Sequence, residues 1–221
     1  MSTEQFKLDK TAFRINTFEE ATYQTAYWRA KSPQERLAAA WYLICAAYNI
    51  DYNNNHPLDK TVFRIKSRKM SNNIFNTDFR DFIQVLNQYE VEYILVGGYA
   101  VILHGYNRTT GDMDIWVNPT KDNYERLAKA FAKFGLPLFD MNLNKFLATE
   151  QYDVFSFGRP PVAIDILTKV KGLKFSQAIQ NANWFEFDDL QVNVLQLEDL
   201  IIAKKAASRN KDLDDLEHLE R

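Results

Sequence analysis

The sequence predicts an α/β (α+β) protein with a small mixed sheet flanked by helices, preceded by a small, mainly helical N-terminal module with two short extended arms. From residue 79 onward, helix-type and strand-type hydrophobic patterns alternate, as expected for a sheet covered by helices. Before residue 70, one eight-residue segment occurs twice, with two helical patterns between its copies. We therefore expect two domains, residues 1–69 and 70–221.

Composition supports a folded, water-soluble chain. Hydrophobic residues make up 46% and charged residues 25% of the 221 positions, which excludes wholesale disorder. The longest apolar run, residues 38–48, has 11 residues, whereas a membrane-spanning helix needs roughly 20. The single cysteine cannot form an internal disulfide, and the N-terminus lacks the apolar core of a signal peptide. We expect a cytoplasmic protein without a membrane partner.

Charge is distributed unevenly between the two expected domains. Residues 1–70 contain 11 Lys or Arg and 7 Asp or Glu, whereas residues 71–221 contain 16 and 22. Opposite net charges favour docking of the two parts, or contact of the basic part with an anionic partner. Ordinary scatter of charge along the chain is the simpler alternative.

The repeated segment reads LDKTAFRI at residues 8–15 and LDKTVFRI at residues 58–65, with seven of eight positions identical. Its β-branched and aromatic residues favour extended structure, so we expect two equivalent arms. Two copies are too few for a solenoid. Exchange of the arms between protomers would give a homodimer.

Two helices are expected between the arms. The segments Thr17–Glu20 and Ser32–Glu35 are capping boxes, and Pro33 occupies the first position of the second helix. We expect the first helix to end near Ala30. The second helix has apolar residues at helical spacing, namely Leu37, Ala40, Trp41, Ile44, Cys45 and Tyr48. A buried, inert Cys45 thiol is expected there, not a nucleophile.

The second domain is expected to begin with an amphipathic helix around residues 79–86. The strands expected after it are 91–96, 112–117, 154–157, 162–167, 184–187 and 192–195. The remaining helices are expected at 99–104, 120–134, 197–208 and 211–219. Thr120 would cap the 120–134 helix and Gly135 would close it.

Three carboxylates interrupt these apolar strands. Strand periodicity places Asp112 and Asp114 on one face, opposite the core residues that alternate with them. Asp165 is flanked by two isoleucines. A charge on a buried strand is costly unless it is paired or bound to a metal, and carboxylate oxygens suit Mg²⁺. A solvated strand end is the alternative for the first pair.

Gly97 and Gly98 follow an expected strand and open an expected helix. Glycine allows a ligand to approach the backbone closely, and N–H groups at such a position can bind phosphate. An isolated Gly-Gly is usually just a tight turn. The order of strand, Gly-Gly, helix, paired aspartates and a later single aspartate is more informative than any one part.

This order resembles the signature of the DNA polymerase β-like nucleotidyltransferases, over residues about 75–219. Thirteen residues separate Gly98 from Asp112, and the Arg108-Thr-Thr-Gly-Asp112 segment is similar to the family's approach to the first aspartate. The tail, with Lys204, Arg209, Lys211, Asp212 and Asp215, is similar to a C-terminal helical motif. The likeness is greatest to small prokaryotic members, including antibiotic nucleotidyltransferases and the toxins of toxin–antitoxin pairs.

The resemblance implies a nucleotidyltransferase fold and transfer of NMP from an NTP, ATP included, to an acceptor hydroxyl, with release of pyrophosphate. Asp112, Asp114 and Asp165 would be catalytic and would hold two Mg²⁺ ions, or Mn²⁺. Gly97, Gly98, Arg108 and Lys204 would bind the nucleotide. The acceptor would be a tRNA, a protein or a small molecule.

Structural roles compete with these assignments. Arg108 would otherwise form a salt bridge, Lys204 would be a solvated helix residue, and the Arg209–Asp215 group would be structural. For His104 and Trp116 we expect packing in place of catalysis.

Two other functions are compatible with part of this pattern. In the first, the N-terminal module masks the site, as in a nucleotide-binding regulatory or toxin–antitoxin-like protein. In the second, the Asp-x-Asp pair belongs to a glycosyltransferase, which would not explain the Gly-Gly or the third aspartate.

Overall fold

The computed structural model describes residues 6–17, 24–48, 50, 52, 74–187 and 190–220. Seven strands form one mixed sheet in the order β1-β4-β5-β3-β2-β7-β6. The strands are β1 (Phe13–Asn16), β2 (Tyr93–Leu95), β3 (Asp112–Val117), β4 (Val154–Arg159), β5 (Val162–Leu167), β6 (Asn183–Phe187) and β7 (Leu190–Val194). Two neighbouring pairs, β3 with β5 and β2 with β7, are parallel, and the other pairs are antiparallel.

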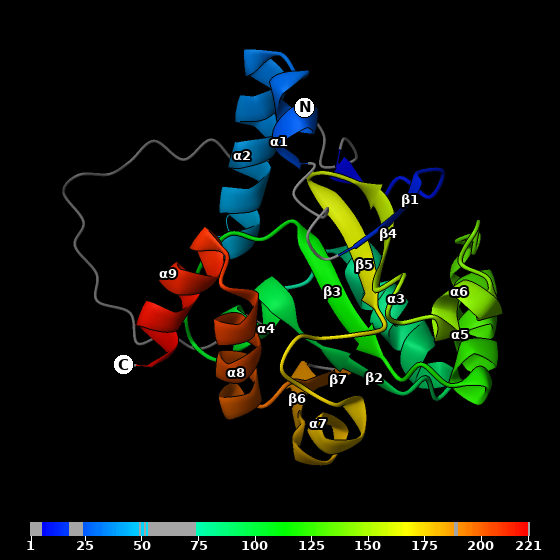
Figure 1. Cartoon of the computed structure of the whole chain (residues 1–221). Coiled ribbons are helices and arrows are strands. Elements are labelled where there is room, and N and C mark those ends of the chain that lie inside the picture. The colour runs from blue at the N-terminus through cyan, green and yellow to red at the C-terminus, as the bar shows by residue number, and fades with distance from the viewer. Residues whose placement is uncertain are drawn as a thin grey trace.

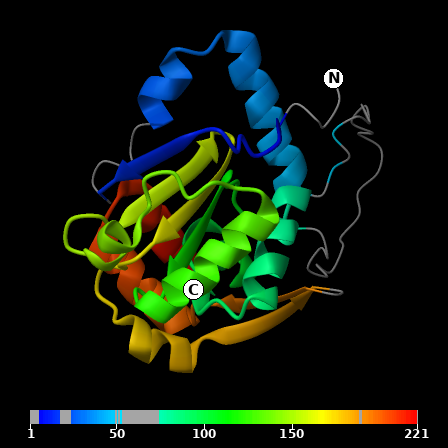
Figure 2. The same cartoon turned by 90° about the vertical axis from the view of Figure 1, so that its right-hand side faces the viewer.

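Helices cover both faces of this sheet (Figures 1 and 2). One face carries α3 (Thr77–Gln88) and α5 (Lys121–Phe134), and the opposite face carries α8 (Leu197–Ala207) and α9 (Asn210–Leu219). The short helices are α4 (Gly97–Leu103), α6 (Leu143–Leu147) and α7 (Phe175–Asn181). None of the described helices is long and apolar enough to cross a membrane. The predicted fold class is confirmed.

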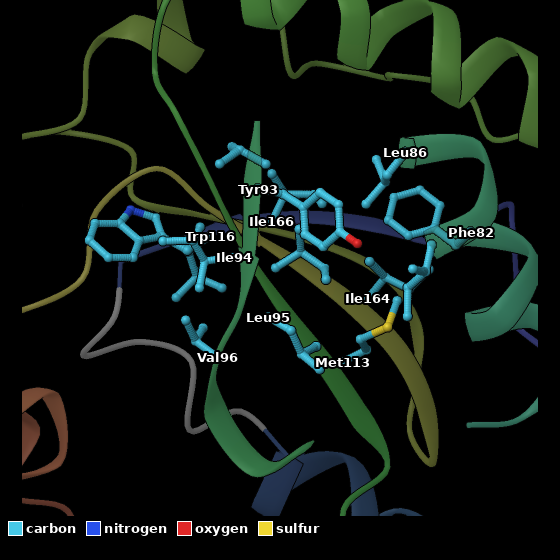
Figure 3. Packing of buried hydrophobic residues seen from close by; sticks show 14 of the residues in the cluster. Phe82, Leu86, Tyr93, Ile94, Leu95, Val96, Met113, Trp116, Ile164 and Ile166 are labelled. Carbon is cyan, nitrogen blue, oxygen red and sulfur yellow. The ribbon is translucent and has the colours of Figure 1, made fainter. Parts of the chain in front are cut away.

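The core lies between the sheet and the face made by α3 and α5. Met113, Ile164 and Ile166 project from β3 and β5 toward Phe82 and other side chains of α3 (Figure 3). These core residues are fully buried, whereas Asp112 and Asp114 alternate with them along β3. The predicted alternation is confirmed, so the carboxylates face away from this core.

Local signals account for the helix boundaries on that face. The Asn76 side chain accepts a hydrogen bond from Phe79 N at 2.8 Å, which caps α3. Thr120 accepts one from Asn123 N at 3.3 Å, and Gly135 ends α5 with φ of 74°. The predicted cap at Thr120 and stop at Gly135 are confirmed.

The N-terminal residues form a helical hairpin and an edge strand. The helices are α1 (Gln24–Arg29) and α2 (Pro33–Tyr48), and the predicted Ser32–Glu35 capping box is present, with Ser32 N donating to Glu35 at 2.9 Å. The first arm forms β1, which pairs with β4 and thus extends the sheet of the second expected domain. The capping box at 17–20, the repeat copy at 58–65 and the boundary near residue 70 fall at least partly outside the described residues and stay predictions.

Helix α2 differs from a core helix in what it buries. Cys45 and Ala39 are buried, which confirms the buried thiol. The rest of the predicted apolar stripe is mostly exposed, with Leu37 at 71% and Tyr48 at 60% of their full accessibility. The predicted helix is present, but the described part of the chain covers its apolar stripe only partly.

Candidate active site

The sheet brings the three predicted carboxylates together. Strands β3 and β5 are parallel, and their register places Asp114 beside Asp165, with Asp112 two residues earlier on β3. All three side chains are half-buried. They line one cavity of about 390 Å³ on the sheet face toward α8 and α9.

The cavity combines this acidic floor with cationic and apolar walls. Its lining includes Gly97, Gly98 and three groups of side chains from several elements. The acidic group is Asp112, Asp114 and Asp165; the cationic group is Arg108, Lys171, Lys204, Arg209 and Lys211; the apolar group includes Val154, Leu167, Val170, Leu195, Leu200 and Ala203. A cationic wall suits phosphate, and an apolar wall suits a base or another flat organic group.

The pKa values of the carboxylates diverge because their surroundings differ. Burial, and then the charges of Asp114 and Asp112, raise the pKa of Asp165 to about 8. Burial and the charge of Asp112 raise the pKa of Asp114. Burial also opposes ionisation of Asp112, but the charge of Lys211 and a 2.9 Å hydrogen bond from the Thr110 hydroxyl lower its pKa overall. Neighbouring carboxyl groups whose pKa values are shifted in opposite directions are typical of catalytic sites.

The donor set fits a hard divalent cation. Two carboxylates lie side by side at half-buried positions, and a cation would relieve their mutual repulsion. The side chains are not gathered into a finished metal centre, since no group of three Asp, Glu, His or Cys side chains within the described ranges is arranged to hold an ion. The chemistry of the oxygens therefore fits a metal, whereas its coordination geometry is not preformed.

Gly97 and Gly98 are required by the side chains that face them. A Cβ at Gly97 would overlap the carboxylate of Asp114, and one at Gly98 would overlap the Thr110 hydroxyl and lie 2.8 Å from Arg108 Nη2. Gly97 also has a φ of +63°, which disfavours other residues. The Gly-Gly turn thus lets the backbone approach the carboxylates and the cationic wall.

Replacing Gly97 by alanine is expected to reduce activity at least about 100-fold, because the new methyl group displaces Asp114. Gly105→Ala is the matched control, since Gly105 has a φ of +102° and open space around its Cβ position. Both variants share backbone strain of roughly 1–2 kcal/mol. Thermal unfolding and steady-state kinetics measure the difference, and equal activities in the two variants would refute the steric role.

Arg108 and Lys204 belong to a buried charge network. The Lys204 ammonium lies 2.8 Å from Asp212 and 2.6 Å from Asp215, and Arg108 Nε lies 3.0 Å from Asp215. Arg209 pairs with Asp212 at 2.8 Å. The network joins α8, α9 and the loop before β3. Lys204 is buried, so the alternative of a solvated helix lysine is wrong; the structural group predicted at Arg209, Asp212 and Asp215 is present.

The remaining predicted residues take packing roles. His104 Nε2 lies 2.7 Å from the carbonyl of Leu195, and its ring contacts Phe185 edge-on. Trp116 is buried and makes an edge contact with Phe175. Both agree with the packing expected for them.

Sequence reasoning gave no role to three residues that reach the site. Lys211 is exposed at the cavity, and Thr110 bonds to Asp112. Thr25 of α1 also lines the cavity, far from it in sequence. Lys211 and Thr110 lie inside the segments that carry the resemblance, which could have suggested them, whereas no local signal identifies Thr25.

The solved structures to which the chain is similar are too distant to assign a function to it. The chain is similar to the lincosamide antibiotic adenylyltransferase LnuA, solved with lincomycin, at 14% identity and a TM-score of 0.44, over 66% of this chain and 96% of that one. It is also similar to a putative nucleotidyltransferase from Thermotoga maritima, with 14% identity and a TM-score of 0.41, over 65% of this chain and 91% of that one. A third similar structure is an antigenic nucleotidyltransferase-like protein from Paracoccidioides brasiliensis. Its identity is 15% and its TM-score 0.40, over 64% of this chain and 73% of that one.

No curated protein matches the sequence. A family model does match it, over residues 75–221, and this family is described as nucleotidyl transferase of unknown function (DUF2204). The matched range contains all three carboxylates and, among the strands that the structure describes, β2 to β7. The chain therefore belongs to this nucleotidyl transferase family.

Proposed function

We propose that the protein transfers NMP from an NTP to an acceptor hydroxyl and releases pyrophosphate. The observation that carries the proposal is that three carboxylates and five Lys and Arg side chains line one and the same cavity. The acceptor oxygen forms a bond to the α-phosphorus, the bond from that phosphorus to the bridging oxygen breaks, and pyrophosphate leaves. Positioning and charge stabilisation supply most of the catalysis in such a transfer.

Each carboxylate has a role in this proposal. Asp112, Asp114 and Asp165 would hold Mg²⁺, or Mn²⁺, which when bound neutralises phosphate charge. Asp165, ionised when the metal is bound, would receive the proton of the acceptor hydroxyl. The side-by-side placement of Asp114 and Asp165 supports a shared centre.

The triphosphate would lie along the cationic wall. Gly97 and Gly98 allow close approach, and Arg108 can contact phosphate while paired with Asp215. Lys204 also lines the cavity, but its ammonium is held by two carboxylates. We assign Lys204 mainly to fixing α9 and propose exposed Lys211 as the direct phosphate ligand from the tail.

The proposed reaction consumes an NTP. A supply of NTPs makes the cytoplasm the expected compartment.

A second candidate is a nucleotide-binding regulatory protein whose N-terminal segment masks the site. It is favoured by Thr25, which reaches the same cavity from α1. Masking predicts that weakening the N-terminal contacts raises activity. An acceptor-binding role for the same segment predicts a loss.

The proposal is tested by incubating the protein with each of the four NTPs, labelled at the α-phosphate, and Mg²⁺. Total tRNA, cell protein and the protein itself serve as acceptors. Label is expected to move into one acceptor class. EDTA, added before the NTP, is expected to prevent this transfer. Failure of every NTP both to bind and to transfer would refute the proposal, whereas saturable binding without transfer would favour the regulatory candidate.

A further inference from the structure

Strand register continues the catalytic row toward the N-terminal arm. Asp114 of β3 is opposite Asp165 of β5, Asp165 is opposite Ser156 of β4, and Ser156 is opposite Arg14 of β1. Register partners on neighbouring strands project from the same face of a sheet. At about 4.8 Å per strand, the Arg14 backbone lies roughly 10 Å from that of Asp165. The arm therefore places an arginine two strands from the third carboxylate, on the same face of the sheet.

The strand that carries Arg14 is firmly anchored. Phe13 stacks on Phe139 at 5.2 Å, and Asp9 pairs with Arg159 at 2.8 Å. Asn16 is buried, and its side chain lies 3.5 Å from the Ser156 hydroxyl. Arg14 itself is exposed. A fixed backbone that carries an exposed arginine is suited to binding an anionic ligand.

Arg14 and three of the cations that line the cavity lie on different elements around Asp165. Arg108, Arg209 and Lys211 approach from the loop before β3 and from α9, on the side of Asp112. The cavity extends in the opposite direction as well, since its lining includes Val154 of β4 and Thr25 of α1. Val154 is the register partner of Asn16, two residues from Arg14. The lining of the cavity therefore comes within one strand of β1, on the sheet face to which Arg14 belongs.

The charge of this side differs from that of the rest of the chain. Residues 6–17 and 24–48 contain six Lys or Arg and two Asp or Glu, whereas residues 71–221 contain 16 and 22. A basic flank on an acidic domain attracts anionic ligands and disfavours cationic ones. Arg in particular forms bidentate hydrogen bonds with phosphate.

We propose that Arg14 binds a phosphate group of the acceptor, so that the acceptor is a phosphate-bearing hydroxyl compound. This inference rests on the proposed nucleotidyl transfer and assigns the acceptor side of the same site. A nucleic acid strand and a small phosphate ester share this chemistry. In both, the phosphate contacts Arg14 while a hydroxyl of the same molecule reaches Asp165.

The test compares acceptors with and without phosphate. A single-stranded RNA oligonucleotide is compared with adenosine, and ribose 5-phosphate with ribose, using NTP labelled at the α-phosphate. The wild-type protein is expected to label one phosphate-bearing acceptor and not its neutral counterpart. Labelling of the oligonucleotide identifies a nucleic acid source, and labelling of ribose 5-phosphate a small ester. Equal labelling of a neutral counterpart, or labelling of neutral acceptors alone, would overturn the inference.

Variants then locate the phosphate contact. Arg14→Glu is expected to raise KM for the phosphate-bearing acceptor at least about tenfold, because it removes a charge-assisted hydrogen bond. KM for the NTP should stay within about twofold, and Arg14→Lys should recover part of the loss. Lys129→Glu makes the same charge change at an exposed position of α5, across the sheet, and should have no effect.

The outcomes separate this inference from the proposed function. If NTP binds and is transferred but Arg14→Glu has no more effect than Lys129→Glu, the acceptor assignment fails alone. If Arg14→Glu raises activity, the arm masks the site and the assignment is wrong. If no NTP binds to the wild-type protein, the proposed function fails and the acceptor assignment fails with it.

Discussion

Asp112→Asn together with Asp114→Asn is expected to reduce nucleotidyl transfer at least about 1,000-fold while leaving the fold intact. Asparagine has nearly the same volume, so packing is conserved. The substitutions remove two negative charges beside Asp165, whose pKa is raised to about 8 partly by them. Stability should therefore be unchanged or higher, because like-charge repulsion in the native state is relieved.

The measurement combines transfer of α-phosphate label with thermal unfolding. Asp140→Asn is the control, because Asp140 is an exposed carboxylate that pairs with Lys145 far from the cavity. The control should retain wild-type activity. Retention of more than about a tenth of the activity by the double variant would show that these carboxylates do not carry the reaction.

Lys204→Met is expected to lower the free energy of unfolding by roughly 3–5 kcal/mol, since it leaves Asp212 and Asp215 buried without their ammonium partner. The side chain of Lys204 is 5% exposed, and those of the two carboxylates are 0% and 1% exposed. Solvent therefore offers little compensation. Arg108 and Arg209 remain as partners, one for each carboxylate, which places the loss toward the lower end.

The adjacent residue supplies a matched control. Lys205 pairs with Glu220 at 2.7 Å, but both side chains are about half exposed. Lys205→Met should change stability by no more than about 0.5 kcal/mol. Chemical denaturation of the two variants gives the comparison. If Lys204→Met kept full stability and lost only nucleotide binding, Lys204 would be a phosphate ligand, as the sequence resemblance implies.

The central part of the fold could be predicted because its signals are local. Strands β3 and β5 have the predicted bounds, since Met113 and Ile115 alternate with Asp112 and Asp114 along β3. The parallel pairing that sets Asp114 beside Asp165 is a property of the whole sheet, which the pattern of neither strand specifies. At β3 and β5 the local hydrophobic pattern and the tertiary fold favour the same structure, as expected of a sequence that folds to one native state.

Two short helices were not predicted. Helix α6 has five residues and α7 has seven, too few to give a clear helical period. Asn142 accepts a hydrogen bond from Lys145 N at 3.0 Å, so a cap signal for α6 was present in the sequence. Helix α7 has no side-chain cap that could have marked its start.

The charge network and the place of the arm depend on tertiary contacts. Lys204 meets Asp212 and Asp215 because Ser208, in the left-handed conformation, turns α9 back onto α8. Helical spacing cannot reveal such a contact between two helices. The arm was predicted to be extended, but its pairing with β4 depends on contacts such as that of Phe13 with Phe157, which are far apart in sequence.

The central claim is that this protein transfers the nucleotidyl group, which contains the α-phosphorus of the NTP, and not the γ-phosphoryl group. The most direct measurement is parallel incubation with the same NTP labelled at the α- or at the γ-phosphate, in Mg²⁺ and with the acceptor that is labelled in the four-NTP assay. The account predicts that the acceptor receives label from the α-position alone and that the γ-label appears in pyrophosphate. Transfer of the γ-label to the acceptor would contradict the account and identify a kinase-type reaction at these carboxylates.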